Sequence, residues 1–146
     1  MTEKSSMPVK LHLETQITQD GQVESHVFDE TGQLVKMGET LYLRYIEHVG
    51  QQAVAVRFKI DPVGHVQLSR GAAKDETQLQ LYFREAEQMV SIYQTQYGRM
   101  PVVTTTNQLA LTLKDQPLSG ELTNQYQLEI SQQMVGDYKL RLIFTA

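Results

Sequence analysis

Hydrophobic and polar residues alternate along most of the chain, which is the pattern of β-strands that bury one face. The alternation is clearest at Val54, Val56, Phe58 and Ile60, where every second residue is apolar. The same period recurs over residues 9–17, 23–28, 40–47, 66–68, 102–113, 121–131 and 138–144. A chain built from such segments is predicted to be all-β.

Residues 61–65 predict a tight hairpin between two of these strands. Gly64 can take the left-handed backbone conformation that closes a three-residue loop, and Pro62 fixes φ at its first corner. The resulting register pairs apolar residues and places one cation among them: Ile60 with Val66, Phe58 with Leu68, and Val56 with Arg70. Arg70 is therefore predicted to point to the apolar side of the sheet.

Four other three-residue segments also have glycine as their last residue and are predicted to be hairpin loops of the same form: 19–21, 30–32, 48–50 and 134–136. These loops would bring apolar residues together as follows: Ile17 with Val23, Leu13 with Val27, Val27 with Val35, Ile130 with Leu140, Leu128 with Leu142, and Tyr126 with Phe144. Gly64 and Gly136 are both expected to have positive φ.

Short hairpins make neighbours in sequence into neighbours in space, which gives an antiparallel up-and-down meander. A meander with one apolar face hides its edges most simply by closing on itself. The predicted fold is therefore a closed β-barrel, and an open two-layer sandwich is the alternative.

In two segments the hydrophobic pattern fits more than one structure. In residues 40–47 the odd-numbered and the even-numbered side chains are both partly apolar, so either set could face inward. Between Lys74 and Tyr93, apolar residues fit helical spacing as well as strand alternation. The β-branched and aromatic residues from Val90 to Tyr97 favour two strands here.

Length and composition are those of a soluble single domain, residues 1–146, in which residues 1–6 form a flexible tail. The chain has no cysteine, which excludes disulfides and thiolate metal sites and fits a reducing, cytoplasmic compartment. No segment has the length and hydropathy of a signal peptide or a membrane span. The formal net charge of -4, with scattered Lys and Arg, argues against binding to nucleic acid or to membranes.

Five segments spread over nearly the whole chain carry a family resemblance: 43–47, 66–71, 93–98, 104–106 and 120–128. In order and spacing they resemble the YwiB-like family, small uncharacterised bacterial proteins with a lipocalin-like (calycin) β-barrel. The sequence departs from the family at Ala86, where a glycine is expected, and its last strand lacks the family's histidines. The resemblance implies a barrel and a small-molecule-binding role, while the family has no established activity.

The sequence offers no catalytic signature. The four histidines have no metal-ligand spacing with one another or with a carboxylate. Glu85 and Glu87 are close together but are expected in a solvated turn. Nucleophile elbows, phosphate loops and dinucleotide-binding motifs do not occur. We therefore expect a protein that is not an enzyme and has no metal or other cofactor.

Arg70 is the residue that the apolar pattern does not explain. A guanidinium among apolar side chains must meet a carboxylate, an aromatic ring, water or an anion. One interpretation is a ligand site in which Arg70, without a fully desolvated carboxylate pair, binds an anionic group. Buried hydroxyls would share that binding, from Tyr93, Tyr97 and Tyr126. The other interpretation is a structural arginine, satisfied by Glu47, by backbone carbonyls or by an aromatic face.

The sequence thus predicts a non-enzymatic barrel that binds a small, partly apolar, anionic molecule. The alternative is a protein-interaction or scaffold module whose barrel is filled by side chains. None of these patterns indicates the oligomeric state.

Overall fold

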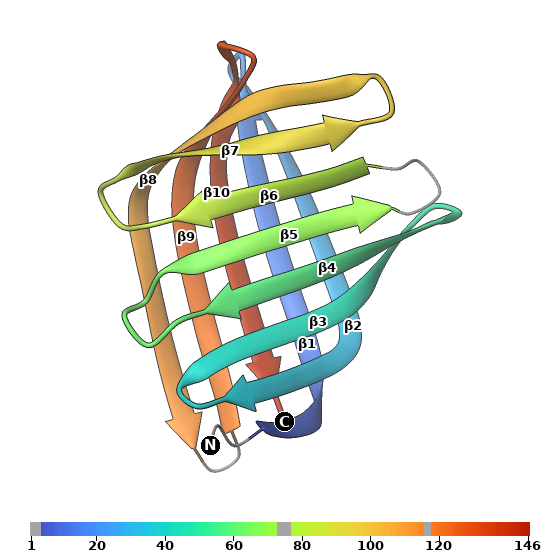
Figure 1. Ribbon diagram of the computed structural model, residues 1–146, viewed down its shortest axis with the longest axis vertical. Helices are drawn as coiled ribbons and strands as arrows, with labels where there is room; N and C mark the ends of the chain where they lie inside the picture. Colours follow the sequence, from blue (N-terminus) through green and yellow to red (C-terminus); the bar gives the residue numbers. More distant parts are fainter. Residues whose placement is uncertain (1–3, 73–76, 116–117) are drawn as a thin grey trace.

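The computed structural model describes residues 4–72, 77–115 and 118–146 and folds them into ten strands (Figure 1). The strands are β1 (Lys4–Gln19), β2 (Gln22–Met37), β3 (Thr40–Val49), β4 (Gln52–Ile60), β5 (Val66–Ala72), β6 (Thr77–Phe83), β7 (Gln88–Thr95), β8 (Gly98–Asp115), β9 (Leu118–Ile130) and β10 (Gln133–Thr145). The alternation of the sequence therefore predicted the fold class correctly.

Each strand pairs antiparallel with its neighbours in sequence, and β1 also pairs with β10, so the sheet closes. Figure 1 shows the shorter strands β3 to β7 crossing in front of the long strands β1, β8, β9 and β10. The predicted architecture, an up-and-down meander closed into a lipocalin-like barrel, is confirmed.

The β4–β5 hairpin has the predicted register. The backbone N–H of Asp61 donates to the carbonyl oxygen of His65 at 3.1 Å, and Gly64 has a φ of +94°. All three predicted pairs form, including Val56 with Arg70. Because Val56 is buried in the core, the side chain of Arg70 is on the inner face of the sheet, as predicted.

Two other turns are one residue shorter than predicted. Asp20 and Gly21 both have positive φ and make a two-residue turn. Residues 50–51 make another two-residue turn between β3 and β4, with positive φ at Gly50. Such turns match the twist of paired strands. The changed register moves Val23 and Val27 to the outer surface, where they are 57% and 59% exposed, so their predicted pairs are wrong.

Gly32 does not lie in a turn, because β2 runs straight through residues 30–32. The predicted loop there and its pairing of Val27 with Val35 are wrong. A Cβ at Gly32 would lie 2.4 Å from the carbonyl oxygen of Arg44 and 2.8 Å from Cδ1 of Leu11. The glycine serves the close packing of β2 against its neighbours.

The β9–β10 hairpin turns earlier than predicted. Ser131 and Gln132 have positive φ and form the turn, whereas Gly136 lies inside β10 and does not have positive φ. A Cβ at Gly136 would lie 2.8 Å from the carbonyl oxygen of Thr18. The predicted pairs are replaced by these: Tyr126 with Tyr138, Asn124 with Leu140, Leu122 with Leu142, and Gly120 with Phe144.

The segment that fitted both a helix and strands forms two strands, β6 and β7, as favoured. Glu85 and Glu87 are exposed in the turn between them, and Ala86 has a φ of +61°. This left-handed conformation explains why a glycine is expected at that position. The start of the 74–93 segment and part of the predicted 115–120 turn lie outside the described residues.

A bulge in β8 changes which of its residues face the core. The register shifts between Thr106 and Gln108, so one extra residue lies in β8. Thr104 and Thr106 consequently face inward on the same side as Leu109, whereas strict alternation along residues 102–113 would place Val103 on that face.

Side chains from all around the sheet fill the barrel. The largest of the fully buried apolar ones are Phe58, Phe83, Phe144, Leu34, Leu43, Ile60, Leu122 and Leu142. Inward positions predicted for β4, β5, β9 and β10 are thus occupied by core residues.

Both ends of the described chain are tied into the sheet. Strand β1 begins at Lys4, inside the segment expected to be a flexible tail, and Ser6 pairs with Val35. Strand β10 pairs with β1 and β9. In the part of the chain that the structure describes, no helix is long and apolar enough to cross a membrane.

Candidate functional site

Strand β3 presents polar side chains to both surfaces of the barrel wall. Leu43, Tyr45 and Glu47 are buried in the interior, whereas Arg44 and Ile46 are exposed outside. The facing that the sequence left open is thereby resolved. One polar set lies inside the barrel and another lies outside it.

Inside the barrel, Glu47 and Arg70 form a bidentate ion pair. Nη1 of Arg70 donates to Oε1 of Glu47 at 3.2 Å, and Nη2 donates to Oε2. The hydroxyl of Tyr45 donates to the same Oε1 at 3.4 Å. The side chain of Glu47 is 0% exposed and that of Arg70 is 32% exposed. Arg70 therefore has the carboxylate partner that the structural interpretation names, in a pair that is not fully desolvated because Arg70 is partly exposed.

The strand pairing does not place Glu47 directly opposite Arg70. Glu47 faces Val54 on β4, while Arg70 faces Val56, so the ion pair runs diagonally across β4. The long arginine side chain can span this distance. A search for a carboxylate only beside Val56 therefore misses Glu47, which is the carboxylate that the structural interpretation names.

The environment keeps Arg70 charged. Burial is the largest influence on Arg70 and lowers its pKa, but the hydrogen bonds and charge of Glu47 outweigh it, so the pKa lies above its ordinary value. Burial, followed by the charge of Glu47, raises the pKa of Tyr45. Tyr45 therefore stays protonated and can donate to the carboxylate. Because the charges of Glu47 and Arg70 cancel, the pair offers little net charge to an anion.

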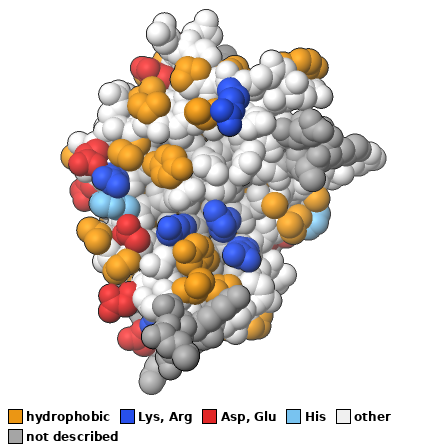
Figure 2. Space-filling model, viewed as in Figure 1, with side chains coloured by type: hydrophobic (Ala, Val, Ile, Leu, Met, Phe, Trp, Pro, Cys, Tyr) orange, Lys and Arg blue, Asp and Glu red, His pale blue; other side chains and the backbone are white. Residues whose placement is uncertain are grey.

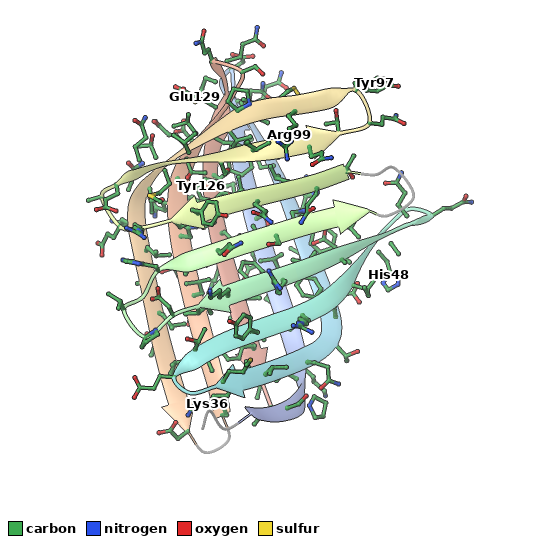
Figure 3. The ribbon with its side chains drawn as sticks, in the orientation of Figure 1. Lys36, His48, Tyr97, Arg99, Tyr126 and Glu129 are labelled. Carbon is green, nitrogen blue, oxygen red and sulfur yellow. The ribbon has the colours of Figure 1, made fainter. Side chains whose placement is uncertain are left out.

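The three tyrosines predicted to bind a ligand do not come together. Tyr126 is buried, with its ring centroid 4.6 Å from that of Phe83 and 5.0 Å from that of Tyr138. Tyr93 is half-buried against the core. Tyr97 is 90% exposed at the β7–β8 turn, away from Tyr126 (Figure 3), so the expectation of a buried hydroxyl there is wrong.

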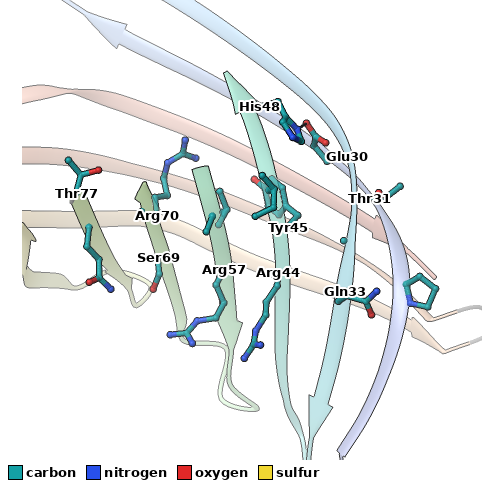
Figure 4. Close-up of a pocket in the computed structure, with 17 residues that line it drawn as sticks. Glu30, Thr31, Gln33, Arg44, Tyr45, His48, Arg57, Ser69, Arg70 and Thr77 are labelled. Atoms are coloured by element: carbon teal, nitrogen blue, oxygen red, sulfur yellow. Dashed lines mark hydrogen bonds and ion pairs between the residues drawn. The ribbon is translucent and has the colours of Figure 1, made fainter. Parts of the chain in front are cut away.

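A hollow of about 930 Å³ is formed by residues of β1 to β6. Its wall includes Arg70, Tyr45, Arg44 and Arg57. The side chains of Arg44 and Arg57 point to the opposite side of the sheet from that of Arg70 (Figure 4). None of the three predicted tyrosines is among the described residues that line it. Its volume lies in the usual range of small-molecule sites, roughly 300 to 1,000 Å³.

Arg44 and Arg57 face each other directly across the β3–β4 ladder. Like charges at such positions repel. Neither guanidinium has an ion-pair or hydrogen-bond partner among the described residues. Their row continues to Gln33 on β2 and Ser69 on β5. Oγ of Ser69 is shielded from solvent, and no described residue gives it a hydrogen-bond partner.

Next to this row lies a row of small or apolar residues, Ile46, Ala55 and Gly71, which also line the hollow. Glu30 is the one acidic residue among the described residues of the wall, and its Oε1 lies 3.5 Å from Nδ1 of His48. The hollow thus has a cationic row beside an apolar one.

Sequence reasoning missed the two outer arginines because of the turn before β4. A three-residue loop at 48–50 would pair Arg44 with Val54, whereas the two-residue turn pairs it with Arg57. Gly50 was the available signal, because a glycine at the first central position is typical of a two-residue hairpin turn.

The outer surface carries contacts between histidines and carboxylates. Nδ1 of His12 lies 2.6 Å from Oδ1 of Asp29, and Nε2 lies 3.2 Å from Oε2 of Glu14. The hydrogen bond with Asp29 is the largest influence on His12 and raises its pKa. Within the described ranges, no group of three or more His, Asp or Glu could hold a metal ion.

Comparison with known proteins gives a family and a fold. The family model for a domain of unknown function, DUF1934, matches residues 11–142. The crystal structure of the ywiB protein from Bacillus subtilis is similar, with a TM-score of 0.80 and 20% sequence identity over 97% of this chain and 92% of that chain. At this identity the likeness is one of fold. No curated protein matches the chain.

Proposed function

The chain belongs to the family of domains of unknown function DUF1934, and we propose, from its own geometry, that it binds a small, partly apolar, anionic molecule without catalysing a reaction. The ligand occupies the hollow of β1 to β6. The observation that carries this proposal is the Arg44–Arg57 pair, two adjacent cations that have no counter-ion among the described residues and lie at the wall of a hollow of ligand size.

The residues of the wall divide the work of binding. Arg44 and Arg57 attract the anionic group, while Ile46 and Ala55 contact the apolar part of the ligand. Arg70 lines the wall, but Glu47 neutralises its charge. In this proposal the ion pair holds β3 and β5 together under the hollow. Ligand contacts of Tyr93, Tyr97 and Tyr126 stay predictions of the sequence.

Calorimetry of the purified protein against a panel of aromatic and aliphatic acids tests this proposal. The parent should bind members of the panel, and the double variant Arg44→Gln/Arg57→Gln should lose at least about tenfold in affinity, equivalent to about 1.4 kcal/mol. Lys59→Gln is the matched control, because Lys59 is on the same face but outside the described wall of the hollow. Binding that is unchanged in the double variant would refute the proposed site.

A second candidate function, a protein-interaction module, is favoured by the filled interior and by Val90 and Ile92 on β7, which are 66% and 48% exposed. Adjacent exposed apolar side chains of this kind can mark interfaces. This candidate predicts a concentration-dependent sedimentation coefficient that Val90→Thr/Ile92→Thr abolishes and Arg44→Gln/Arg57→Gln leaves intact. A parent that sediments as a monomer at all concentrations would count against self-association through this surface.

A further inference from the structure

We propose that the anion bound by Arg44 and Arg57 is a phosphate-type dianion carried by a molecule with an apolar body, and not a single carboxylate. This inference rests on the proposed function and names the ligand class of the same site. It follows from charge, from donor geometry and from the side chains beside the arginine pair.

The charge of the site calls for more than one negative charge. Arg44 and Arg57 are opposed across the ladder, and Figure 2 shows Lys and Arg side chains gathered near the centre of the face over β3 and β4. A monoanion neutralises one guanidinium and leaves the other uncompensated. A phosphate monoester carries about -1.5 to -2 charges at pH 7, so it relieves the repulsion of both.

The donors of the site suit a tetrahedral group. Each guanidinium presents a planar fork of N–H donors that can bind two oxygens at once. A carboxylate has two oxygens to share between two such forks, whereas a phosphate monoester has three terminal oxygens. The third oxygen can accept from Ser69, whose Oγ is shielded and lacks a partner in the described structure. A shielded hydroxyl without a partner is unfavourable, and a phosphate oxygen would satisfy it once the flexible Arg57 side chain turns to the anion.

The neighbouring row specifies the rest of the ligand. Ile46, Ala55 and Gly71 line the hollow next to the arginines and provide an apolar wall with little side-chain bulk between β3 and β5. Glu30 lies elsewhere in the wall and repels a second anionic group. The site therefore fits a molecule with one phosphoryl end and one flat or narrow apolar end.

Three matched ligands separate charge, shape and simple anion binding: phenyl phosphate, phenyl sulfate and benzoate, each titrated at pH 7.5 by calorimetry. Phenyl sulfate has the shape of phenyl phosphate but a single charge. We expect phenyl phosphate to bind about tenfold more tightly than either, a difference of about 1.4 kcal/mol. Arg44→Gln and Arg57→Gln should each remove this preference. Ser69→Ala should weaken phenyl phosphate but not benzoate, and Lys59→Gln should preserve the preference.

The outcomes distinguish this inference from the proposed function. If benzoate and phenyl sulfate bind as tightly as phenyl phosphate, and the arginine variants weaken all three, the site is an anion site and the phosphate inference is overturned. If none of the three binds, both proposals fail. Inorganic phosphate is the fourth ligand, and binding as tight as that of phenyl phosphate would overturn the apolar part of the inference. Thermal melts of each variant establish that loss of binding is not loss of folding.

Discussion

Glu47 on β3 and Arg70 on β5 are joined across β4 inside the barrel, and the carboxylate of this pair is 0% exposed. The pair links strands that do not hydrogen-bond to each other. The carboxylate of Glu47 also neutralises the guanidinium of Arg70, so Arg70 contributes little charge to the binding of an anionic ligand. The structural interpretation of Arg70 thereby explains its position, and the candidate anion site lies on the other side of the same wall.

Breaking this pair should destabilise the protein. Arg70→Met leaves the Glu47 carboxylate buried without its counter-ion, which costs about 3 to 5 kcal/mol for fully buried pairs and about 2 to 4 kcal/mol here, because Arg70 is partly exposed. Urea denaturation measures the loss. The double variant Glu47→Leu/Arg70→Met should recover most of it, since apolar replacement of both partners is often neutral. A single Arg70→Met variant as stable as the parent would mean that the pair does not form in solution.

Ala86→Gly should stabilise the protein. Ala86 has a φ of +61°, a conformation in which glycine avoids the strain of a Cβ, and the gain should be about 0.5 to 1 kcal/mol. The change is measured from the shift of the urea midpoint. Glu85→Gly in the same turn is the control and should not stabilise, because Glu85 does not have positive φ. Lower stability of Ala86→Gly would show that this turn has a different conformation.

Gly120→Ala should destabilise the closing hairpin. A Cβ at Gly120 would lie 2.4 Å from Cζ of Phe144 and 2.9 Å from Cδ2 of Leu113, so the core must shift at a cost of about 1 to 3 kcal/mol. Ser119→Ala, one residue earlier in β9, should stay within about 0.5 kcal/mol of the parent. Equal thermal stability of Gly120→Ala and Ser119→Ala would contradict the register in which Gly120 faces Phe144.

His12 should titrate above its ordinary pKa, mainly because of its hydrogen bond with Asp29. A histidine whose pKa is raised in the folded state adds stability that is complete below its unfolded pKa, about 6.5, and is lost as the pH rises through the folded pKa. Asp29→Asn should lower the pKa of His12 in an NMR titration and flatten this dependence. A His12 titration that is identical in parent and variant would exclude the contact.

How far the sequence predicts this fold depends on the turns. Alternation along single strands correctly placed Val56, Phe58 and Ile60 in the core, and it predicted ordered strands joined into a barrel. Register across strands was correct only at residues 61–65, where proline and glycine fix the loop length. Asp20–Gly21 makes a turn one residue shorter than expected, and a bulge after Thr106 inserts a residue that no local pattern reveals.

The site depends on register, and this is why only part of it was predicted. Arg70 was placed on the inner face because its hairpin was correct. The sequence does not assign Arg44 to one face, because the residues on both sides of its strand are partly apolar and because the predicted turn at 48–50 is one residue longer than the turn that forms. The diagonal reach of Arg70 to Glu47 is a tertiary contact, which pairing between adjacent strands does not predict.

Methyl NMR during titration with phenyl phosphate tests the central claim most directly. Ile46 and Ala55 lie in the hollow beside the arginine pair, Ile60 is in the core, and Ile92 is on the outer surface of β7. The account predicts saturable shifts at Ile46 and Ala55, little change at Ile60 and Ile92, and no saturation in Arg44→Gln/Arg57→Gln. Unshifted Ile46 and Ala55 methyls, or the same saturation in the double variant, would contradict anion binding in the hollow.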